Sequence, residues 1–156
     1  MNIKKLSIIM IAVLGFASMS QLLLAHCQVP CGIYDDEMRV KMIAEHITTI
    51  EKAMNQVIAL SKETPVNYNQ VVRWVVNKEK HAEELTDIIT YYFMAQRVKP
   101  VPKTDEKNYG HYLEQLEVLH NLMVYTMKAK QSTDLTVIEE MRKLLKKFEE
   151  LYFHKE

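Results

Sequence analysis

The stretch DEMRVKMIAEHITTIEKAMNQVIAL, residues 36–60, decides the fold class of this chain of 156 residues. Its apolar residues recur at steps of three and four, which is the period of one face of an α-helix. These are Ile43, Ile47, Ile50, Met54 and Val57. Asp35 and Asp36 offer capping oxygens and negative charge at the start, and Thr64-Pro65 breaks the pattern because proline lacks a backbone donor. The sequence therefore predicts a helix from about Asp36 to Lys62.

Three further patterns with the same period follow, each bounded by helix-breaking or capping residues. The first runs from near Asn69 to before Pro100 and carries Val72, Val75, Ala82, Leu85, Ile89 and Tyr92 or Phe93. The second, near Asp105 to Lys130, carries Tyr109, Tyr112, Leu116, Leu119, Met123 and Met127. The third follows the capping sequence Ser132-Thr133-Asp134 and carries Leu135, Ile138, Met141, Leu145, Phe148 and Tyr152.

These four stripes indicate an all-α protein. The β-branched run at residues 71–76 suits a strand by propensity, but the charged pattern around it favours one long helix. Glycine and proline are scarce, with three and four residues, which also favours helices. Four amphipathic helices with short connections bury their apolar faces most simply as an antiparallel four-helix bundle. We expect residues 26–156 to form this single domain.

Residues 1–25 have the composition of a targeting segment. Lys4 and Lys5 precede an apolar stretch from Leu6 to Ala17, which has the length of a signal-peptide core. We expect this segment to be removed as a signal peptide or propeptide, although an uncleaved membrane anchor is the alternative. Its removal leaves 18 basic and 20 acidic residues, a balance that argues against nucleic acid as a partner.

The only two cysteines, Cys27 and Cys31, lie directly after this segment in the sequence His26-Cys27-Gln28-Val29-Pro30-Cys31-Gly32-Ile33-Tyr34. In an exported protein they can form a disulfide, but so small a loop would add little stability. Cys27 can also be a lipid-bearing N-terminus, although a histidine before it suits lipoprotein processing poorly. Both alternatives describe a non-catalytic exported protein.

Cleavage between Ala25 and His26 allows a third interpretation of this segment, as a metal site. It creates a free amine on His26, and the set of donors then comprises this amine, the His26 imidazole, the Cys27 amide nitrogen and the thiolates of Cys27 and Cys31. Two nitrogens and two sulfurs in a plane suit Ni(II) or Cu(II), whereas zinc prefers a tetrahedron. Binding through a deprotonated backbone amide favours nickel over iron or manganese. Residues 26–34 are therefore a candidate metal-binding hook.

The pattern His26-Cys27-x-x-Pro30-Cys31-Gly32-x-Tyr34 resembles the nickel-binding hook of the nickel superoxide dismutases, and the helical remainder is also similar to that family. The resemblance implies a mature chain that begins at His26, a four-helix bundle, a homohexamer and one nickel ion per chain, with the His26 imidazole as an axial ligand. It implies that two superoxide ions are converted to O₂ and H₂O₂. Tyr34, and less directly Tyr92, resemble the tyrosines that line the approach to nickel.

The resemblance also sets expectations for processing and location. A maturation protease must expose His26, and no stable membrane association should remain after cleavage. Export to the periplasm or secretion is expected from residues 1–25, with the cytoplasm after propeptide removal as the alternative. Gln28 replaces an aspartate of some members, and His81 lies at a loosely similar position near the hook. His46, His111 and His154 are expected to be solvated or hydrogen-bonded surface groups, and His120 belongs to a lone Glu-x-x-His spacing.

Overall fold

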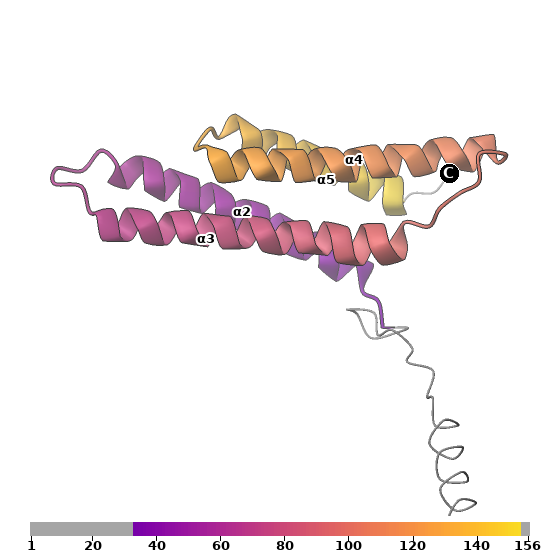
Figure 1. Ribbon diagram of the computed structural model, residues 1–156, viewed down its shortest axis with the longest axis horizontal. Coiled ribbons are helices and arrows are strands. Elements are labelled where there is room, and N and C mark those ends of the chain that lie inside the picture. Colours follow the sequence, from indigo (N-terminus) through magenta and orange to yellow (C-terminus); the bar gives the residue numbers. More distant parts are fainter. Residues whose placement is uncertain (1–32, 154–156) are drawn as a thin grey trace, which may run out of the picture. The chain divides into compact units, whose positions relative to one another are not determined.

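The computed structural model of the chain describes residues 33–153, which form helices and their connections and contain no strand (Figure 1). In order these are α2 (Asp36–Leu60), α3 (Tyr68–Asp87), the π-helix η1 (Ile88–Arg97), α4 (Glu106–Gln131) and α5 (Thr136–Phe153). Consecutive α-helices run in opposite directions, α2 also contacts α5, and α3 also contacts α4. The predicted antiparallel four-helix bundle is confirmed. Within this part of the chain, no helix is long and apolar enough to cross a membrane.

The helices begin at the capping residues that the sequence offers. The carboxylate of Asp35 accepts a hydrogen bond from the backbone amide of Met38 at 2.8 Å, and the side chains of Asn67 and Asp105 play the same part for α3 and α4. Such side chains satisfy amides of the first turn, which have no acceptor within the helix. The predicted helix boundaries are therefore close to the observed ones.

The apolar stripes of the four helices meet in one core. Its fully buried large side chains are Phe93, Phe148, Ile43, Ile47, Ile50, Met54, Leu85, Ile89, Leu119, Leu122, Ile138 and Met141. The rings of Phe93 and Phe148 meet edge to face, with centroids 4.9 Å apart. This contact between η1 and α5 fixes the end of the bundle at which α2 begins, because such aromatic pairs have preferred orientations.

Three residues assigned to the core by periodicity lie elsewhere. Val72, Val75 and Met127 are 59%, 37% and 51% exposed, so their assignment to buried faces is wrong. In the next turn of α3, Lys78 is buried instead. An apolar period alone does not show which of two candidate faces the neighbouring helices will cover.

Buried Lys78 links α3 to the end of α4. Its ammonium group donates hydrogen bonds to the carbonyls of Ala129, Lys130 and Ser132 at 2.8, 2.7 and 3.0 Å. The last carbonyls of a helix lack donors within the helix, and a cation near them also complements the helix dipole. Burial lowers the pKa of Lys78, the nearby Glu79 carboxylate opposing the shift, and the three carbonyls solvate the ammonium in place of water.

The predicted long helix before Pro100 is confirmed, but its last part is not α-helical. From Ile88 the chain adopts the wider π-helical turn, and the amide of Val98 bonds to the carbonyl of Phe93, five residues earlier, at 2.8 Å. π-Helical turns are rare and occur frequently at functional sites. Residues five apart thereby come to lie on the same side of the helix.

Candidate metal centre

The predicted nickel ligands His26, Cys27 and Cys31 lie outside the described residues, as do Pro30 and Gly32. Of the hook, residues 26–34, the structure describes Ile33 and Tyr34. It therefore shows the surface of the bundle at which the hook sequence is attached. We call this surface the hook base and define it by Tyr34, Asp36, Tyr92, Arg97 and Tyr152.

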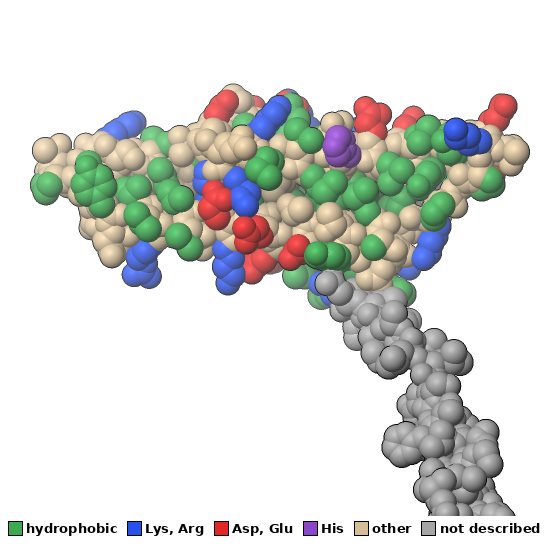
Figure 2. Space-filling view, in the orientation of Figure 1, with side chains coloured by type: hydrophobic (Ala, Val, Ile, Leu, Met, Phe, Trp, Pro, Cys, Tyr) green, Lys and Arg blue, Asp and Glu red, His purple; other side chains and the backbone are tan. Residues whose placement is uncertain are grey.

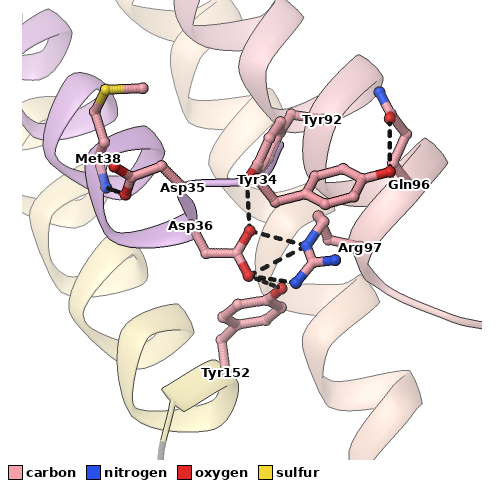
Figure 3. A network of polar contacts seen from close by, with 8 residues as sticks. All are labelled: Tyr34, Asp35, Asp36, Met38, Tyr92, Gln96, Arg97 and Tyr152. Carbon is pink, nitrogen blue, oxygen red and sulfur yellow. Dashed lines mark hydrogen bonds and ion pairs between the residues drawn. The ribbon is translucent and has the colours of Figure 1, made fainter. Parts of the chain in front are cut away.

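Tyr34 lies at the edge of the hook base, directly before α2. The guanidinium carbon of Arg97 stands 4.4 Å from the centroid of its ring, and Tyr92 meets the ring edge to face with centroids 6.0 Å apart. Its hydroxyl points to the Gln96 amide oxygen at 3.5 Å, a long contact, and the residue is 37% exposed (Figure 3). The ring is therefore held by η1 while the hydroxyl remains accessible to water.

Asp36 is the centre of the hook base and joins three helices. Its carboxylate accepts hydrogen bonds from Arg97 Nε and Nη2 at 2.8 and 2.6 Å (Figure 3). It also accepts bonds from the hydroxyls of Tyr92 and Tyr152 at 2.5 and 2.8 Å. Donors from η1 and α5 thus converge on the first turn of α2. Bidentate pairing with arginine is among the stronger polar interactions in proteins.

The pKa values in this cluster follow from burial and charge. Burial alone would raise the pKa of Asp36, but hydrogen bonds from Arg97, Tyr92 and Tyr152 outweigh it and bring the pKa below its ordinary value. For Tyr152, burial and then the bond to the Asp36 carboxylate raise the pKa to about 12. The same two causes raise the pKa of Tyr92. Both phenols therefore remain protonated and donate their hydrogen bonds to the ionised Asp36 carboxylate.

The π-helix makes this convergence possible. Tyr92 and Arg97 are five residues apart, the spacing of a π-helical hydrogen bond, and both side chains reach Asp36. In an α-helix, neighbours on one face are three or four residues apart. The wider turn thus aims a phenol and a guanidinium at one carboxylate.

Asp36, Arg97 and Tyr152 also border a cleft of about 1200 Å³. Its other walls come from α4, α5 and the connection between η1 and α4, and they include Lys99 and His111. Basic and acidic side chains both line it. The hook base is therefore reached by solvent from this side as well as at Tyr34.

The remaining histidines fall into different environments. His46 and His81 approach each other, and the expectation of a surface position is wrong for His46, because its side chain is only 12% exposed. His111 contacts the Gln115 amide nitrogen at 3.1 Å, in agreement with a hydrogen-bonded group. His120 is exposed, and His154 lies outside the described residues.

Comparison with known proteins decides the family. The family model described as nickel-containing superoxide dismutase matches residues 21–156, which include the whole hook and all described helices. The chain belongs to the nickel-containing superoxide dismutase family. No match was found among curated proteins or among solved structures. As a member of this family, the chain is a nickel-dependent oxidoreductase with superoxide as its substrate, and nothing supports the non-catalytic alternative.

The sequence did not predict three residues of the hook base. Asp36 was expected only to supply negative charge at a helix start, and Arg97 and Tyr152 were given no polar role. Both residues bind Asp36, which lies 61 positions before Arg97 and 116 positions before Tyr152, so local spacing in the sequence does not reveal these contacts. The unusual density of polar and aromatic residues after Ile89 was the one available hint.

Proposed function

We propose that nickel is held at the N-terminus created when a maturation protease removes residues 1–25. The ligands are the amine and imidazole of His26, the amide nitrogen of Cys27 and the thiolates of Cys27 and Cys31. The observation that supports this proposal is that the family match extends across these residues. The donor set itself fits the group, because two nitrogens and two thiolates suit a square-planar nickel ion.

The reaction converts two superoxide ions and two protons to O₂ and H₂O₂. Nickel bound at the hook supplies the one-electron Ni(II)/Ni(III) couple that this reaction needs, because anionic thiolate and amide ligands stabilise the higher oxidation state. The chain's own residues must then hold the hook, limit access to it and deliver two protons.

We assign proton delivery and the restriction of access to Tyr34. Three peptide units separate it from Cys31, so the two Cα atoms lie within about 11 Å of each other. Its hydroxyl is near the solvent, whereas the hydroxyl protons of Tyr92 and Tyr152 are engaged by Asp36. Arg97, which pairs with Asp36 and stacks on the Tyr34 ring, fixes the ring relative to α2.

The free amine of His26 provides the decisive experiment. Adding one alanine before His26 of the mature chain should abolish dismutation, because the amine is moved away from its chelate ring. Adding one alanine after Glu156 is the matched control and should leave activity unchanged. The intact mass of the purified protein should correspond to a chain that begins at His26 with one nickel ion. Full activity of the N-terminally extended chain would refute this ligand set.

We further propose a homohexamer, supported by the family resemblance and by apolar surface on α3. Tyr68, Val72 and Val76 are 73%, 59% and 60% exposed, and Figure 2 shows hydrophobic side chains gathered over the first turns of this helix. Exposed apolar patches of this kind mark protein contacts. Sedimentation should give six chains per particle, and Val72→Lys with Val76→Lys should reduce that number.

For location we propose the periplasm or the extracellular space. The support is the sequence of residues 1–25, in which two lysines precede an apolar segment. Fractionation of the native host, followed by mass determination, tests this. A mature chain found in the cytoplasm would indicate a propeptide instead of an export signal.

A further inference from the structure

A second group of metal-ligating side chains lies between α2 and α3, away from the hook base. His46 Nδ1 is 2.9 Å from His81 Nδ1, and the two nitrogens lie 3.6 and 3.5 Å from Glu84 Oε2. The three side chains are 12%, 25% and 40% exposed. They form the one group of three or more potential metal ligands found within residues 33–153.

The spacing of these three atoms matches the edges of a metal coordination tetrahedron. Zinc binds imidazole nitrogen and carboxylate oxygen at about 2.0–2.2 Å, which places neighbouring ligand atoms about 3.3 Å apart in a tetrahedral site. The observed separations of 2.9, 3.5 and 3.6 Å bracket that value. We propose that His46, His81 and Glu84 bind a zinc ion as a site separate from the nickel hook.

The donors differ from those proposed for the hook and suit zinc. Two imidazoles and one carboxylate provide no thiolate, so they do not offer the ligand field that stabilises oxidised nickel. They do correspond to a known three-ligand arrangement for zinc, with the fourth position left to water. The other oxygen of Glu84, Oε1, lies 3.6 Å from the Lys80 ammonium, so Oε2 is the oxygen that faces the imidazoles.

The environment also favours the neutral imidazole that a metal needs. Burial lowers the pKa of His46, and the neighbouring His81 lowers it further, against the opposing effect of Glu84 and Glu45. His46 is therefore less easily protonated than a histidine in water. Metal binding competes with protonation of its ligands, so this shift assists binding.

The site is too far from the hook base to share its metal. His46 follows Asp36 by ten residues of one continuous helix, which corresponds to about 15 Å along the axis. A metal ion held by His46 on one side and by His81 and Glu84 on the other connects α2 with α3. Binding should therefore stabilise the folded chain, because a ligand of the native state alone raises its stability.

The test measures zinc binding by a mature chain that lacks the hook ligands. His26→Ala, Cys27→Ser and Cys31→Ser are combined, the protein is freed of metal with a chelator, and Zn²⁺ is added in a calorimeter. We expect one zinc ion per chain and a higher unfolding temperature with zinc than without it. Co²⁺ at the same site should show the intense visible absorption of a tetrahedral complex.

Variants then assign the site. His46→Gln or His81→Gln in this background should weaken zinc binding at least a hundredfold, and Glu84→Gln at least tenfold. His120→Gln is the matched control, because His120 is exposed and belongs to another helix. His81 is the more exposed of the pair, so its variant remains informative if His46→Gln fails to fold. Absence of zinc binding, or unchanged zinc binding by His81→Gln, would refute the proposed site. The contact between the two imidazoles would then be only a hydrogen bond.

Discussion

Replacing Asp36 by asparagine should destabilise the bundle by about 2–3 kcal/mol. The change removes a negative charge that pairs with Arg97 and that accepts hydrogen bonds from two phenol hydroxyls at 2.5 and 2.8 Å. Breaking a buried ion pair from one side costs about 3–5 kcal/mol, because the other charge remains buried. Here Arg97 and Asp36 keep 28% and 16% of their side-chain surface, so water compensates for part of that cost. Urea unfolding at equal protein concentration measures the difference.

Glu37→Gln is the matched control for Asp36→Asn. Both substitutions remove one negative charge from the first turn of α2 and so weaken the helix dipole interaction equally. Glu37, however, is 76% exposed and has only Lys41 at 4.0 Å. Its replacement should cost no more than about 0.5 kcal/mol. If the two variants lose the same stability, the converging hydrogen bonds are not what makes Asp36 important.

The pH dependence of the Asp36 effect has a definite sign. The folded pKa of Asp36 lies below the ordinary value of 3.8, so the carboxylate stabilises the fold fully above pH 3.8. This contribution is lost as the pH falls through the lower folded pKa. The difference in unfolding free energy between wild type and Asp36→Asn should thus be constant from neutral pH down to about pH 5 and shrink below pH 4. A difference that grows on acidification would contradict the assignment.

Three further substitutions test single contacts. Lys78→Met should lower the unfolding free energy by about 2–4 kcal/mol, because three carbonyls at the end of α4 lose their donor. Lys80→Met, on the exposed face, is the control and should cost less than about 1 kcal/mol. Equal losses in urea titrations would refute the role of Lys78 as a cap of α4. Tyr92→Phe should cost about 1–2 kcal/mol in the same assay, because one bond to Asp36 is lost and the ring contacts remain. Tyr34→Phe should lower kcat for dismutation about tenfold and change the pH profile of kcat without affecting stability. Tyr91→Phe is the control, because Tyr91 is also an exposed tyrosine. An unchanged pH profile in Tyr34→Phe would show that Tyr34 does not deliver protons.

Much of the fold was predictable because its determinants are local. The stripe of Ile43, Ile47, Ile50 and Met54 is buried as its period requires, and Asp35 caps the helix that it precedes. Helical periodicity and capping depend on residues within a few positions of each other, so a sequence displays them directly. Val72 has the same helical period but is exposed, because the burial of a residue also depends on which neighbouring helix covers its face.

The proposed nickel hook likewise depends on the sequence alone. His26, Cys27 and Cys31 are close in the chain, and we proposed the donor set from their order, without a contact from the fold. Tertiary structure decided the rest: the convergence of Tyr92, Arg97 and Tyr152 on Asp36, and the approach of His46 to His81. These contacts join residues 35 to 116 positions apart, and they arise only when helix packing and a π-helical turn set the directions of the side chains.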